Sequence, residues 1–126
     1  MLRPDEFYMS EALRLAHIAY QEGEIPVGAV VVADGRIIGK GYNQVERLQD
    51  PTAHAEMLAI SSACNALNAR HLKGCSLYVS LEPCPMCAGA ISWAQLERIV
   101  FAASDEKRGF QVHSPSLLPP RTIIFG

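Results

Sequence analysis

The chain has 126 residues, of which 49% are hydrophobic and 19% are charged, and its formal net charge at pH 7 is −2. This length predicts a single domain, 1–126, that buries one hydrophobic core. Proteins that neutralise many phosphates are basic, so the slight acidity excludes a broad nucleic-acid-binding surface and leaves room only for a local RNA contact.

The hydropathy pattern argues against a membrane protein. No apolar run approaches the roughly 20 residues of a membrane span. The first segment is charged and lacks the apolar stretch of a signal peptide. We therefore expect a cytoplasmic protein with no membrane partner, in which the four cysteines stay reduced.

The first third of the chain predicts a helix followed by a hairpin. Apolar residues at helical spacing over 5–22 indicate an amphipathic helix, which Gly23 ends. Two apolar segments, 27–33 and 36–42, flank Asp34-Gly35, which is a turn signal. Together they predict a β-hairpin.

The rest of the chain alternates helices and strands. The expected elements are a polar loop at 44–49, a helix at 53–69, a strand at 76–81, a helix at 85–94, a strand at 98–102 and a strand at 122–125, while the prolines within 110–120 exclude a long helix. This order predicts an α/β fold: a three-layer α/β/α sandwich on a five-stranded mixed sheet, with parallel later strands behind the antiparallel hairpin. Ligand sites in such sheets collect at the carboxyl ends of strands.

Two motifs fall at such ends, an H-x-E motif at His54 and a P-C-x-x-C motif at Cys84. Cys84 and Cys87 lie on one side of a helical turn that Pro85 can begin. The positive end of a helix favours thiolate, the form that binds metal. Two thiolates and the imidazole of His54 make a three-ligand set for one Zn²⁺, with the fourth position open as in catalytic sites.

Glu56 is the predicted catalytic residue. Residues two apart in a helix interior point about 200° apart, but in a first turn both side chains can reach over the helix end, so Glu56 and His54 can share a target. Asp50 and Thr52 are expected to cap this helix. A carboxylate beside a zinc-activated water can take its proton and deliver it elsewhere.

The C-x-x-C motif alone also fits structural zinc or redox chemistry. A structural site needs a fourth protein ligand, and Cys64 and Cys75 lie outside the motif. Redox chemistry of the thioredoxin type needs no distant H-x-E. The two motifs together are the signature of zinc-dependent nucleobase deaminases.

Three longer segments extend this pattern: IPVGAV at 25–30, DPTAHAEM at 50–57 and LEPCPMCAGA at 81–90. Through them the chain resembles the bacterial tRNA-specific adenosine deaminases of the cytidine deaminase-like superfamily, over residues 10 to 109. Guanine and other small-base deaminases share much of these segments. The resemblance implies a zinc-dependent hydrolase that converts adenosine to inosine at the wobble position of tRNA, with the anticodon loop as partner and a homodimeric assembly.

The resemblance also implies substrate-binding roles. Asn43 should hydrogen-bond the base, Val27 should line the pocket, and Asp105 should contact the sugar. Glu82 is expected to support the site, or to cap a helix, rather than to act as a second base. The tRNA-editing enzymes usually continue with a C-terminal helix that helps to hold the anticodon loop. This sequence stops at Gly126, so we expect that helix to be absent, a departure that bears on RNA affinity.

Two other functions remain open on the sequence alone. One is a small-molecule deaminase that acts on guanine, cytosine or a nucleoside. It would suit the slightly negative net charge and the expected absence of the C-terminal helix. A zinc-stabilised RNA-binding or scaffold domain without enzymatic activity would leave Glu56 without a task.

Overall fold

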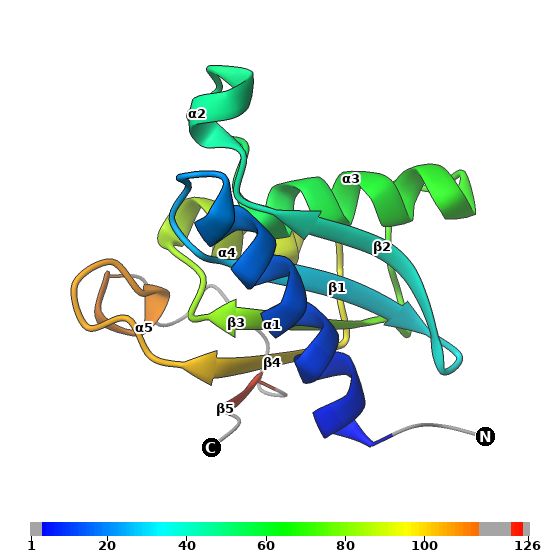
Figure 1. Ribbon diagram of the computed structural model, residues 1–126. Coiled ribbons are helices and arrows are strands. Elements are labelled where there is room, and N and C mark those ends of the chain that lie inside the picture. Colours follow the sequence, from blue (N-terminus) through cyan, green and yellow to red (C-terminus); the bar gives the residue numbers. More distant parts are fainter. Residues whose placement is uncertain (1–3, 114–121, 125–126) are drawn as a thin grey trace.

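The computed structural model describes residues 4–113 and 122–124, and it places one mixed sheet between helices (Figure 1). In chain order the elements are α1 (Asp5–Gln21), β1 (Gly28–Ala33), β2 (Arg36–Tyr42), α2 (Val45–Leu48), α3 (Ala55–Leu67), β3 (Ser76–Leu81), α4 (Pro85–Trp93), β4 (Arg98–Ala103), α5 (Phe110–His113) and β5 (Thr122–Ile124).

The sheet has the strand order β2-β1-β3-β4-β5. β1 runs antiparallel to both β2 and β3, whereas β3, β4 and β5 are parallel. Asp34 and Gly35 join β1 to β2 with φ angles of 50° and 76°, the left-handed conformation that a tight two-residue hairpin turn requires. The expected α/β fold with a mixed sheet and an antiparallel hairpin is therefore confirmed.

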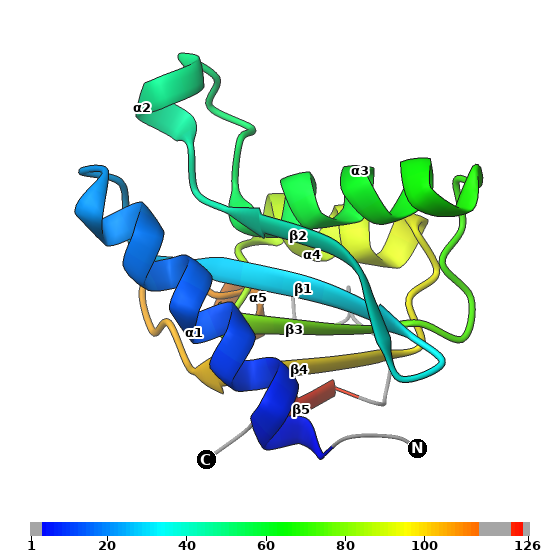
Figure 2. The same ribbon diagram turned by 45° about the vertical axis from the view of Figure 1, so that its right-hand side comes forward.

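Helices cover both faces of this sheet (Figure 2). α1 packs on one face over a cluster that includes Tyr8, Met9 and Val100. α3 and α4 pack on the other face over a larger cluster of buried residues. Gly39 and Gly41 let α3 approach β2 closely, since a Cβ on either would lie 2.5 Å from a backbone oxygen of α3.

Three local expectations need correction. The segment 44–49 is not a loop throughout, because it contains α2. The helix expected at 53–69 is shorter and spans Ala55–Leu67. Asp50 does not cap it: its Oδ1 accepts the N–H and hydroxyl of Thr52 instead.

The last part of the chain agrees with the sequence pattern where it is described. α5 is a four-residue helix, consistent with the exclusion of a long one, and the segment 114–120 lies outside the described residues. β5 covers Thr122–Ile124, while the expected strand residue Phe125 lies outside them too. Among the described helices, none is both long and apolar enough to cross a membrane.

Candidate active site

The starts of two helices bring the predicted metal ligands together. His54 occupies the N-cap position of α3, and Cys84 occupies that of α4, both with extended backbones. Pro85 takes the first turn of α4, where its missing N–H costs nothing. Cys87 follows three residues after Cys84, so the two side chains lie on one side of the first turn of α4.

The resulting cluster fits a zinc ion. The Nδ1 atom of His54 lies 3.5 Å from the sulfur of Cys87 and 3.8 Å from that of Cys84. All three ligand atoms lie within 4.8 Å of one another. Tetrahedral zinc with bonds of about 2.3 Å to sulfur and about 2.0 Å to nitrogen separates such ligands by about 3.5 Å. Two sulfurs and one imidazole also suit zinc chemically, so His54, Cys84 and Cys87 would hold the ion.

Hydrogen bonds to one sulfur favour its anionic form. The thiol of Cys87 and the backbone N–H groups of Met86 and Cys87 donate to Cys84 and lower its pKa to about 5. This donation and burial raise the pKa of Cys87. The helix starts also direct their positive ends toward the cluster. The cluster is therefore built to hold negative charge, which a metal cation would neutralise.

Glu56 lies beside the cluster, in the first turn of α3, and is 4% exposed. Its carboxylate interacts with the Cys87 thiol and with its own backbone N–H, while burial raises its pKa to about 7. A carboxyl group with a pKa near neutrality can both accept and release a proton. The structure therefore places the three predicted ligands and this carboxyl group together.

A pocket of about 340 Å³ opens over the cluster. Its lining includes His54, Glu56 and Cys84, and also the predicted substrate-binding residues Asn43 and Val27. The volume falls in the range of about 300–1,000 Å³ that is typical of small-ligand sites. It would accommodate a nucleobase.

Asn43 has a structural task that sequence reasoning missed. Its Oδ1 accepts the backbone N–H of Ala55 at 2.8 Å and so caps α3. Because that oxygen is engaged, the side chain can offer its NH₂ group, a hydrogen-bond donor, to a ligand. Asn43 is 6% exposed and lines the pocket.

Glu82 and Asp105 shape the wall of the pocket next to α5. The buried carboxylate of Glu82 accepts the backbone N–H groups of Asp105 at 3.0 Å and of Gln111 at 2.9 Å. The expected supporting role of Glu82 agrees with these contacts, because the bond to Gln111 caps α5. Asp105 lines the pocket, but its Oδ1 accepts the N–H groups of Lys107 and Arg108, so a ligand would approach through its other oxygen.

Glu24 also lines the pocket, and nothing in the sequence singled it out. This buried carboxylate accepts the N–H groups of Glu46 at 3.1 Å and Arg47 at 2.9 Å. It thereby fixes α2, which stands above the sheet (Figure 1). A charged residue after a helix-ending glycine is ordinarily exposed, so the sequence held no local sign of its burial.

The chain is similar over most of its length to known deaminases. Residues 2–103 match the family described as cytidine and deoxycytidylate deaminase zinc-binding region. The tRNA-specific adenosine deaminase of Aquifex aeolicus is 49% identical over 94% of this chain, which covers 78% of that protein. The Bacillus subtilis protein of the same name is 51% identical over 83% of this chain, which covers 65% of it.

Solved structures share the fold. A structure from a study of A-to-I editing by tRNA:A34 deaminases has 40% identity and a TM-score of 0.87, over 94% of this chain and 91% of that one. Guanine deaminase from Bacillus subtilis has 47% identity and a TM-score of 0.79, over 81% and 66%. The similarity to tRNA-specific adenosine deaminases expected from the sequence is confirmed, and the chain belongs to the cytidine and deoxycytidylate deaminase zinc-binding family.

Proposed function

We propose that this protein is a zinc-dependent hydrolase that converts adenosine to inosine at the wobble position of tRNA. The reaction class rests on one observation: Glu56 lies against a zinc-fitting cluster inside a base-sized pocket. The substrate rests on similarity to proteins named tRNA-specific adenosine deaminase, at 49% and 51% identity. We also infer a cytoplasmic protein in which residues 1–126 form a single domain, because 126 residues suit one hydrophobic core.

His54, Cys84 and Cys87 hold the metal in this proposal, and the zinc ion, when bound, supplies Lewis-acid activation of a water molecule. Glu56 takes a proton from the water that attacks the ring carbon bearing the amino group. It delivers this proton to the adjacent ring nitrogen, then takes the second proton from the newly added hydroxyl group and delivers it to the departing amine. Ammonia leaves and a carbonyl group remains, so the atoms balance as a hydrolysis.

The remaining predicted site residues orient the substrate. Asn43 donates its NH₂ group to an acceptor on the base, an assignment supported by the engagement of its oxygen with Ala55. Val27 is buried and contributes apolar surface to the pocket. Asp105 accepts a hydrogen bond from the sugar. The target nucleotide must be unstacked to reach this depth, as in other enzymes that act on a base.

Deamination of a free base is a second candidate, favoured by a specific observation. The guanine deaminase of Bacillus subtilis is 47% identical to this chain, which is close to the identity of the tRNA-specific enzymes. Its substrate, guanine, has no sugar and no phosphate. A homodimer, which the family resemblance implies, is compatible with either substrate.

Ammonia release distinguishes the candidates. The zinc-loaded protein is incubated separately with an anticodon stem-loop carrying adenosine at the wobble position, with the same stem-loop carrying guanosine there, and with free adenosine, cytosine and guanine. We expect inosine to form in the first stem-loop only. Turnover confined to free guanine would replace the proposal by the second candidate, and inactivity on every substrate would reject a deaminase.

A further inference from the structure

The pocket is lined by several acidic side chains and by one basic side chain. Five carboxylate residues line it: Glu24, Glu46, Glu56, Glu82 and Asp105. Among the described lining residues, Arg108 is the one lysine or arginine. A phosphate approaching this pocket would be repelled by most of its wall and attracted at Arg108.

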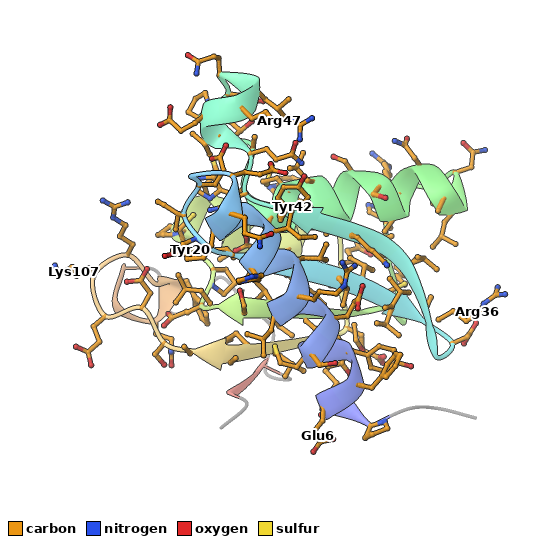
Figure 3. All side chains as sticks on the ribbon, in the orientation of Figure 1. Glu6, Tyr20, Arg36, Tyr42, Arg47 and Lys107 are labelled. Atoms are coloured by element: carbon orange, nitrogen blue, oxygen red, sulfur yellow. The ribbon has the colours of Figure 1, made fainter. Side chains whose placement is uncertain are left out.

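Arg108 has no carboxylate partner among the ion pairs of the described residues, in contrast to four other basic side chains. Arg14, Lys40, Arg47 and Arg98 each form an ion pair with an acidic residue. Arg108 is exposed, and within the described part of the chain it forms no ion pair. Its neighbour Lys107 points away from the body of the protein (Figure 3). The unpaired guanidinium at the mouth is therefore available to an anion.

The backbone around Arg108 is held in place by hydrogen bonds. Its N–H donates to Oδ1 of Asp105 at 3.1 Å, and the N–H of Gly109 donates to the carbonyl of Asp105 at 2.9 Å. The carboxylate of Glu82, which anchors both ends of this turn, fills the space beside Gly109, where a Cβ would collide with it.

This anchoring ties the turn to the metal cluster, because Glu82 precedes Cys84 by two residues. The position of the Arg108 backbone relative to the cluster is thus fixed before any ligand binds. Preorganisation of this kind reduces the entropy lost when a charged contact forms.

We propose that Arg108 binds a phosphate adjacent to the nucleoside whose base enters the pocket, and that it thereby selects a nucleotide over a free base. This inference rests on the proposed function and deepens it. A nucleotide whose base is inserted into a pocket keeps its sugar and flanking phosphates at the mouth, where Arg108 lies. A guanidinium can bind phosphate through two parallel hydrogen bonds, which a lysine cannot reproduce.

The test compares Arg108→Gln, Arg108→Lys and Arg36→Gln with the unmodified protein, all zinc-loaded. Arg36 is exposed at the start of β2, away from the pocket, so its replacement removes the same charge elsewhere (Figure 3). The substrates are the adenosine stem-loop, adenosine monophosphate, adenosine and guanine, and kcat/KM for the stem-loop is measured at several salt concentrations.

We expect Arg108→Gln to lower kcat/KM for the stem-loop by about 10- to 100-fold, mainly through KM. The slope of log(kcat/KM) against log[salt] should become shallower by about one. Arg108→Lys should restore part of the loss, and Arg36→Gln should change kcat/KM less than about twofold. Zinc content should not change. A loss on adenosine monophosphate of the same size would assign the contact to the nucleotide's own phosphate, whereas a loss on the stem-loop alone would assign it to the next phosphate in the chain.

Two results would overturn the inference. One is unchanged stem-loop kinetics in Arg108→Gln when the unmodified protein is active on the stem-loop, which would leave the proposed function intact. The other is a loss of kcat/KM in Arg108→Gln that is as large for free adenosine or guanine, where these are turned over, as for the stem-loop. Such a loss would show a general disturbance of the pocket. An unmodified protein inactive on the stem-loop but active on guanine would overturn this inference and the proposed function together.

Discussion

The side-chain oxygen of Asn43 accepts the backbone N–H of Ala55 at 2.8 Å, so the residue after β2 caps the helix that carries His54 and Glu56. One amide group thus has two ends with different tasks. The oxygen holds α3, which leaves the NH₂ group as the part of the side chain that can serve the pocket that Asn43 lines. Substitutions can separate the tasks because aspartate keeps an acceptor oxygen but has no donor.

We therefore expect Asn43→Asp to keep most of the stability and lose most of the activity. Removal of a helix cap lowers the free energy of unfolding by about 1 kcal/mol, so Asn43→Ala should lower Tm by several degrees. Asn43→Asp should lower Tm less. Both variants should lose about 10-fold or more in kcat/KM, because neither donates to the base. Thermal unfolding and stem-loop kinetics provide the measurements. Wild-type activity in Asn43→Asp would show that no donor is needed.

Glu56→Gln tests the assignment of the proton-transferring group. The carboxylate is not a member of the three-residue cluster, so we expect stoichiometric zinc to remain while turnover falls by about 10²–10⁴-fold. Glutamine preserves the side-chain volume of this buried position, which keeps the pocket intact. Zinc content by atomic absorption and ammonia release are measured on the same sample. Loss of zinc would instead make Glu56 a ligand.

Cys87→Ala tests the metal site itself. We expect the variant to lose zinc, and its Tm to fall by about 5 °C or more, because metal binding contributes folding free energy. Cys75→Ala is the matched control, since Cys75 is also a buried free cysteine but lies outside the cluster. The control should retain zinc. If Cys87→Ala kept one zinc per chain at unchanged Tm, the ligand set would be wrong.

The predictions that succeeded from the sequence depended on short-range patterns. Cys84 and Cys87 are related by one helical turn, and Asp34-Gly35 is a local hairpin signal, so neither needed knowledge of distant residues. The H-x-E motif and the P-C-x-x-C motif were expected to meet because each follows a strand of the same sheet, and in the structure each lies at the start of a helix.

The features that the sequence did not predict depend on distant contacts. α2 is held by Glu24, which lies about 20 residues earlier in the chain and accepts two of its backbone N–H groups. A helix of four residues is also too short to show a repeating pattern of apolar residues in the sequence. The cap of α3 comes from Asn43 rather than from Asp50, its nearer candidate, because β2 ends beside the first turn of α3. The exposure of Arg108 among carboxylates likewise follows from the packing of separate segments.

The ion pair between Asp5 and Arg98 should make stability depend on pH. The carboxylate of Asp5 accepts hydrogen bonds from Nη1 and Nη2 of Arg98 at 2.8 and 2.6 Å, and from the hydroxyl of Tyr78 at 2.6 Å. The hydrogen bond from Arg98 is the main reason why the pKa of Asp5 falls from 3.8 to about 2. This network fastens the start of α1 to β3 and β4.

Because the pKa is lower in the folded state, the unfolded chain binds the proton first as pH falls. The network's contribution is complete above about pH 4 and disappears toward pH 2. Solvent screening of the partly exposed pair limits it to about 1–2 kcal/mol. We therefore expect Asp5→Asn to lower the free energy of unfolding by that amount at pH 7, with the difference from the unmodified protein shrinking between pH 4 and pH 2. Glu6→Gln, an exposed neighbour on the same turn (Figure 3), is the control and should change it little. Urea unfolding across this pH range gives the free energy of unfolding of all three proteins. If the difference between Asp5→Asn and the unmodified protein stayed constant down to pH 2, the charge of the Asp5 carboxylate would not be its cause.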